Sequence, residues 1–204
     1  DRPIERHARS LPEVYNDNLA HLKDLARKVA EASGMPFADV HGPMIAAMEK
    51  GKAAFGKDYD VCGTDGVHPR PNGHLVMAYA FLKGMGLDGQ LALFTLDLKG
   101  GASVSEGHTL VSSSGATMVV QSRRYPFCFW GDAKSADGTL SILPFVPFND
   151  DLNRFTLVVK NLDALQAKVS WDGSSKSFSR EALAQGINLA AEFLDNPFSE
   201  PFAN

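Results

Sequence analysis

The sequence predicts a mixed α/β protein in which a helix-rich first part is followed by a β-rich second part. In residues 1–89, apolar residues recur at helical spacing on both sides of one short apolar run. From Gln90 onward, short runs rich in β-branched and apolar residues alternate with turn residues. Three glycines, Gly84, Gly86 and Gly89, mark the change of pattern. We therefore expect two domains, residues 1–89 and residues 90–204.

The first part is predicted to hold three helices and one strand. The first helix starts at Ser10, a suitable N-cap, and ends near Gly34. Its apolar face comprises Leu19, Leu22, Ala26 and Val29. Residues 36–40 predict a short buried strand, and residues 43–52 predict the second helix.

The third helix is predicted over residues 73–85 and has almost no polar face, so it must be covered on nearly all sides. This order of elements is typical of the end of a doubly wound α/β domain. Because one strand cannot bury such helices, we expect these residues to pair with a further segment or to expose an apolar patch.

The second part is predicted to be built mainly from strands. Asp172-Gly173 is a hairpin turn signal between two of these strands, for a loop of two residues or a longer one. Ser179 is expected to cap a short helix that ends near Gly186, and residues 196–202 are expected to be extended. The predicted strands are residues 91–98, 108–112, 117–122, 154–159, 167–171 and 176–178.

Charge and hydropathy exclude two classes of partner. The net charge is −4, and no basic cluster exceeds a pair such as Arg123-Arg124, so we expect no nucleic-acid partner. The longest apolar stretch, residues 75–82, is far too short to span a bilayer. Two cysteines, Cys62 and Cys128, make no disulfide framework; they could form a single bridge or be two small buried side chains.

The residues with the clearest chemical potential are Asp65 and His68, in a Gly- and Pro-rich turn before the third helix. An aspartate can hold a histidine through Nδ1–H, which leaves Nε2 free to accept a proton from a hydroxyl. The alternative for an isolated Asp-x-x-His is a hydrogen bond that only braces the turn.

Four segments follow one another within residues 11–88: residues 15–19, residues 37–41, Asp65-Gly66-Val67-His68-Pro69, and Asn72-Gly73-His74. In this order they resemble the SGNH/GDSL hydrolase family, and the resemblance covers roughly residues 11–88. It implies the later part of a three-layer α/β/α domain, ester hydrolysis without a cofactor or metal, and a secreted or periplasmic location. It also implies that His68 is the general base and that Asp65 orients it.

The family's Gly-Asp-Ser nucleophile block has no match in these residues. The one Gly-Asp pair, Gly131-Asp132, is followed by Ala133 and comes after the histidine. We therefore expect a serine esterase, with acetyl esters of carbohydrate among the candidate substrates, whose serine lies on an N-terminal segment outside these residues. The alternative is a non-catalytic module that binds a carbohydrate or a protein, with Trp130 and Trp171 on its surface.

Two further histidines, His41 and His74, are close in sequence to these segments. The spacing Asp-x-x-His-x₅-His is no established zinc pattern, so we expect no metal here. For both residues we expect structural hydrogen bonds instead.

Overall fold

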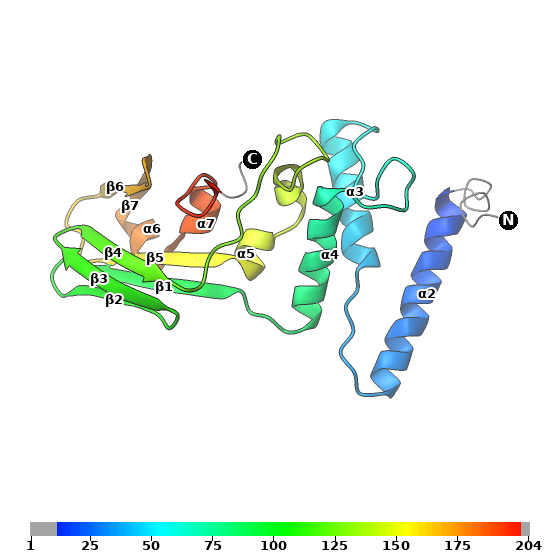
Figure 1. Cartoon of the computed structure of the whole chain (residues 1–204), viewed down its shortest axis with the longest axis horizontal. Coiled ribbons are helices and arrows are strands. Elements are labelled where there is room, and N and C mark those ends of the chain that lie inside the picture. Colours follow the sequence, from blue (N-terminus) through cyan, green and yellow to red (C-terminus); the bar gives the residue numbers. More distant parts are fainter. Residues whose placement is uncertain (1–11, 201–204) are drawn as a thin grey trace. The chain divides into compact units, whose positions relative to one another are not determined.

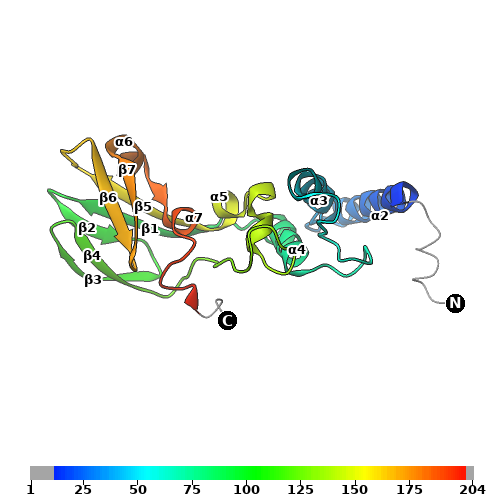
Figure 2. The same ribbon diagram turned by 90° about the horizontal axis from the view of Figure 1, so that it is seen from above.

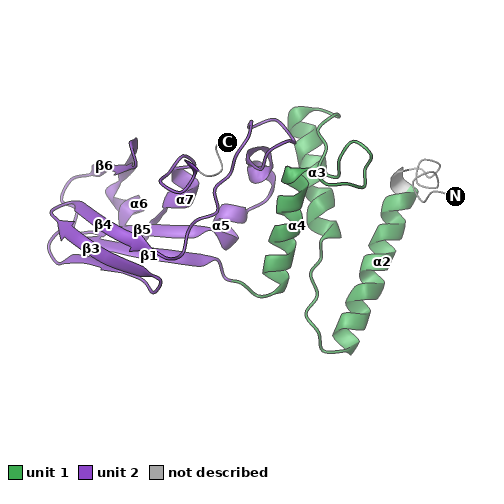
Figure 3. Cartoon of the chain, in the orientation of Figure 1, with its two compact units in different colours: residues 1–87 green, residues 88–204 purple. Residues whose placement is uncertain are grey.

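The computed structural model describes residues 12–200 and has a mixed α/β fold, as the sequence predicts (Figure 1). The chain divides into two compact units, one ending at Leu87 and the other beginning at Asp88 (Figure 3). We call these unit 1 and unit 2 and describe each by itself. The predicted capping role of Ser10 lies outside the described residues.

Unit 1 consists of three helices in its described part: α2 (Pro12–Ala32), α3 (His41–Phe55) and α4 (Pro71–Gly84). Helices α3 and α4 lie side by side (Figure 1). The strand predicted over residues 36–40 is wrong, because these residues adopt no regular structure. A strand needs a neighbour for its backbone hydrogen bonds, and the described part of unit 1 offers none. The three-layer arrangement therefore stays a prediction.

Helix α4 is buried on one side only. Leu75, Val76 and Ala80 are buried, whereas Phe81 is 49% exposed and Met85, just after the helix, is 65% exposed. The opposite flank of unit 1 is also apolar at its surface, since α2 exposes Leu22, Leu25 and Val29. The described helices thus leave apolar faces uncovered, which is unusual for a complete small domain.

Unit 2 is organised around a four-stranded sheet in the order β2-β1-β5-β8. Strands β1 (Gln90–Asp97) and β5 (Arg154–Lys160) run parallel at its centre, and β2 (Gly101–Val104) and β8 (Ile187–Asn188) pair antiparallel at the edges. The inward face of this sheet carries the core of the unit, which includes Ala92, Phe94, Phe155, Leu157 and Val159.

Two antiparallel hairpins accompany the sheet (Figure 2). The first joins β3 (His108–Ser114) to β4 (Thr117–Ser122), and the second joins β6 (Gln166–Trp171) to β7 (Ser174–Ser179). The second turn is the predicted Asp172-Gly173 pair, with φ of 47° and 81°, as a two-residue hairpin turn requires. Alternate side chains of both hairpins pack against the core.

Short helices complete unit 2: η1 (Leu140–Phe145), α5 (Phe148–Leu152), α6 (Arg180–Gln185) and α7 (Leu189–Glu192). Ser179 caps α6 by accepting a hydrogen bond from Ala182 N, which confirms that prediction. All six predicted strands are present, with bounds shifted by a few residues.

Residues 196–200 form turns instead of the predicted extended segment, because Asn196 accepts from Phe198 N and Ser199 Oγ folds back on Asn196. Phe198 packs against Trp171, with ring centroids 6.1 Å apart, while Phe202 lies outside the described residues. No helix within residues 12–200 is long and apolar enough to cross a membrane.

Candidate active site: the Asp65–His68 pair

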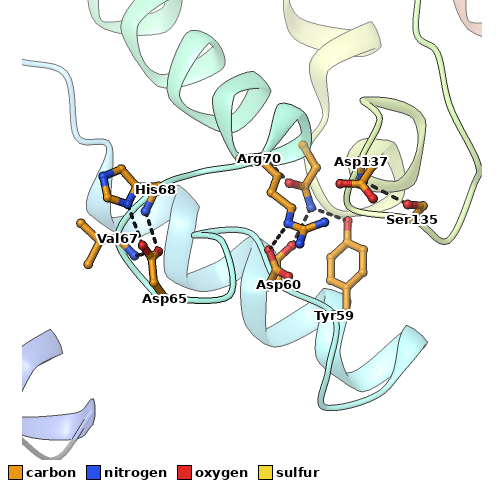
Figure 4. A network of polar contacts seen from close by, with 10 residues as sticks. Tyr59, Asp60, Asp65, Val67, His68, Arg70, Ser135 and Asp137 are labelled. Carbon is orange, nitrogen blue, oxygen red and sulfur yellow. Dashed lines mark hydrogen bonds and ion pairs between the residues drawn. The ribbon is translucent and has the colours of Figure 1, made fainter. Parts of the chain in front are cut away.

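Asp65 and His68 form a closed hydrogen-bonded loop just before α4 (Figure 4). Asp65 Oδ1 accepts hydrogen bonds from the backbone N–H groups of Val67 and His68, each at 3.0 Å. Asp65 Oδ2 lies 2.6 Å from His68 Nδ1. The carboxylate therefore fixes both the backbone and the ring of His68, as an Asx-type turn followed by a histidine permits.

Gly63 sets the shape of this loop. Its φ of 76° is left-handed, and a Cβ placed there would lie 2.1 Å from the carbonyl oxygen of His68. The backbone of His68 thus approaches residue 63 more closely than any side chain allows. Gly66, with φ of 73°, closes the turn by donating its N–H to Gly63 O at 3.0 Å, but a Cβ there would meet nothing within 4 Å.

A buried amide anchors the end of the loop. Asn72 donates to Tyr59 Oη at 3.1 Å and to Asp60 O at 2.8 Å, and its side-chain oxygen accepts from Gly73 N at 2.7 Å. Gly73 packs so closely that a Cβ there would meet Val61 O. The segment before the loop is thereby joined to the first turn of α4, and Arg70 adds an ion pair with Asp60 at 3.4 Å (Figure 4). The sequence analysis missed the positioning roles of Asn72 and Arg70. The Asn72-Gly73 pair was the feature of the sequence that pointed to them.

The geometry sets the tautomer of His68. An ionised carboxylate can only accept, so Nδ1 carries the ring hydrogen and the Nε2 lone pair is free. The side chain of His68 is 75% exposed, and that of Asp65 is 48% exposed. Nε2 is therefore open to a proton donor from outside, which is the condition that the general-base hypothesis sets.

The hydrogen bond from His68 is the largest cause that lowers the pKa of Asp65, followed by the backbone N–H groups of Val67 and His68. The carboxylate stays ionised well below its ordinary range. A carboxyl whose pKa is lowered on folding contributes stability above its ordinary pKa of 3.8 and loses it as the pH falls through the lower folded value.

The other predicted histidine contacts differ from expectation. His74 is exposed at the start of α4, and within residues 12–200 its ring makes no hydrogen bond. His41 begins α3 with Nε2 buried and unpartnered among the described residues, so the expected hydrogen bond of its ring is also missing at that atom. The described part of the chain brings no three His, Cys, Asp or Glu residues together as metal ligands.

The cysteines and tryptophans are placed as follows. Cys62 and Cys128 are free thiols, so the single bridge does not form, and burial raises the pKa of both.

Trp171 stacks on Phe155 with ring centroids 5.7 Å apart and an angle of 16°, so it packs inside unit 2 and not on an outer binding face. Trp130 is 40% exposed, which leaves it available to a partner.

Neither protein-family models nor curated proteins match this chain. Among solved structures, the chain is similar to a gut microbial diltiazem-metabolizing enzyme, with a TM-score of 0.67 and 28% sequence identity over 89% of this chain. The similarity supports the mixed α/β fold. The match covers 42% of the neighbour, so this chain spans less than half the length of the protein that it resembles.

Proposed function

We propose that this chain supplies the aspartate and histidine of a serine esterase of the SGNH type, whose serine lies on a segment outside these residues. The observation that carries the proposal is the Asp65–His68 contact of 2.6 Å beside an exposed ring. In this arrangement His68 Nε2 takes the proton of the serine hydroxyl as it attacks an ester carbonyl, then returns that proton to the leaving alcohol. Asp65 holds the ring and stabilises the imidazolium.

Two further observations support the proposal. The apolar faces of α2 and α4 are uncovered in the described part of unit 1, as expected if another segment packs on them. The solved neighbour is an enzyme that metabolises a drug and has a chain well over twice as long as the matched part. Small-molecule and carbohydrate esters are the substrate class that we expect.

The test uses the whole protein that contains this chain and a short acyl ester such as p-nitrophenyl acetate. His68→Ala is expected to lower kcat about 100- to 10,000-fold, because a general base contributes that much to a proton transfer. Asp65→Asn should lower kcat in the same direction, since it removes the acceptor that selects the tautomer. The matched control is His74→Ala, an exposed histidine six residues later without a side-chain hydrogen bond in the described structure, and it should stay within a few-fold of the parent.

A fluorophosphonate probe then locates the nucleophile. We expect covalent labelling of one serine outside residues 1–204, and loss of that labelling in His68→Ala. Labelling of a serine within residues 1–204 would contradict the division of the triad. Full ester turnover in His68→Ala would end the hydrolase proposal.

A further inference from the structure

Unit 2 contains a partly open cavity of about 440 Å³ that the esterase proposal does not use. The residues that line it come from the inward face of the sheet, from the two hairpins and from the segments that follow them. Its walls are mostly apolar and aromatic, and include Phe94, Met118, Val120, Phe155 and Trp171. Cavities of roughly 300–1,000 Å³ with such walls and a few polar groups are typical of small-molecule sites.

Four polar residues line the cavity, and three of them, Thr117, Lys168 and Ser170, are exposed, whereas Ser122 lies on the inward face of its strand. The burial of β4 alternates, so that Met118, Val120 and Ser122 are half-buried while the residues between them are exposed. Across the hairpin Ser122 pairs with His108, and the hydroxyl oxygen lies 2.9 Å from His108 Nδ1.

The contacts of His108 fix the direction of these hydrogen bonds. Its Nε2 lies 3.0 Å from the carbonyl oxygen of Leu91, which can only accept, so Nε2 carries the hydrogen of the neutral ring. Nδ1 is then an acceptor, and Ser122 donates its hydroxyl hydrogen to it. The ring is held by edge contacts with Phe94 and Phe155, with centroids 5.0 Å and 5.6 Å away.

Because its hydrogen is committed to His108, the Ser122 hydroxyl offers only lone pairs to the cavity. A half-buried acceptor prefers a ligand that brings a donor, and apolar walls prefer a ligand with an apolar body. We infer that unit 2 binds a small apolar molecule that carries one hydroxyl or N–H group, and that this group donates to Ser122 Oγ. The inference rests on unit 2 alone and is independent of Asp65 and His68.

The binding experiment uses the full chain with Trp130→Phe, which leaves Trp171 at the cavity as the remaining tryptophan. The probes are 4-butylphenol, which has a donor, and 4-butylanisole, in which a methyl group replaces the donor hydrogen. At a pH where histidine is neutral, we expect both to change Trp171 fluorescence in a saturable way, with affinities measured in parallel by calorimetry.

Ser122→Ala tests the polar contact. It should weaken 4-butylphenol binding about 3- to 10-fold, as expected for one hydrogen bond, and leave 4-butylanisole within about twofold. Ser122→Thr keeps the hydroxyl and should restore the preference. Any general loosening of the hairpin would weaken both probes alike, so the difference between them isolates the hydrogen bond.

A matched pair on the same strand tests the location. Val120→Phe fills the cavity and should abolish binding of both probes, whereas Val119→Phe points to the opposite side of β4 and should leave binding unchanged. The thermal unfolding midpoint of each variant reports whether it folds. Absence of saturable binding of either probe to the parent chain would overturn the inference. Equal loss of both probes in Ser122→Ala would overturn the donor preference.

Discussion

Replacing Gly63 with alanine tests how the loop holds His68. Forcing an L-residue into the left-handed region costs about 1–2 kcal/mol, and this cost applies equally at Gly66, whose φ is nearly the same. At position 63 the new Cβ would also lie 2.1 Å from His68 O, against the 3.0 Å below which real Cβ contacts essentially never fall. The backbone of His68 must therefore move by about 0.9 Å.

If the ring of His68 moves with its backbone, the 2.6 Å distance between Asp65 Oδ2 and His68 Nδ1 lengthens to about 3.5 Å, the limit of a hydrogen bond. The pKa of Asp65 reports the loss, because the hydrogen bond from His68 is the main cause that lowers it. Gly63→Ala should thus raise the pKa of Asp65 toward its ordinary 3.8, and Gly66→Ala should leave it low.

The assay follows the side-chain carboxyl carbon of Asp65 by NMR as the pH is lowered, in the parent chain and both variants. Thermal unfolding measured alongside should show a loss of about 1–2 kcal/mol in Gly66→Ala, and at least that in Gly63→Ala. If the pKa of Asp65 is equally low in the two variants, the close approach of Gly63 to His68 does not position the ring.

Three further outcomes follow from the structure. His68→Ala should raise the pKa of Asp65 only part of the way to its ordinary value, because the backbone N–H donors remain. The same NMR titration measures this pKa, and an unchanged value would contradict the hydrogen bond between Asp65 and His68. Asn72→Ala should lower the free energy of unfolding by about 1–3 kcal/mol in urea titrations, since it removes the three hydrogen bonds of a buried amide. Thiol titration of the denatured, unreduced chain should find both Cys62 and Cys128 reactive, and recovery of fewer than two thiols would contradict the free state.

The β-rich part was largely predictable because its signals are local. Asp172-Gly173 predicts a hairpin turn by its tolerance of positive φ, and the strands on both sides follow from their alternation; the structure shows that the loop has two residues. The edge strands β2 and β8 have only four and two residues, too few to be recognised by alternation, so their pairing with β1 and β5 defines them. The turns at residues 196–200 depend on the side-chain contacts of Asn196 and Ser199, which spacing alone does not reveal.

In unit 1, the error over residues 36–40 has a different cause. A run of five residues with four apolar side chains and one aspartate, Asp39, fits a strand or a connecting segment equally well, and only the presence of a partner strand decides between them. The Asp65–His68 contact was predictable, because a spacing of three across Gly66 returns the carboxylate to the ring. The close approach of Gly63 and the buried amide of Asn72 were not, since both depend on packing between segments.

The protonation state of His68 tests the central claim most directly. Two-bond ¹H–¹⁵N correlation spectra of the chain above the titration range of histidine distinguish the two nitrogens of each ring, with His68→Ala providing the assignment. We predict a hydrogen on Nδ1 and a bare Nε2, as the carboxylate of Asp65 requires. A hydrogen on Nε2 would mean that this nitrogen cannot accept the proton of a serine hydroxyl, and His68 would not be the general base.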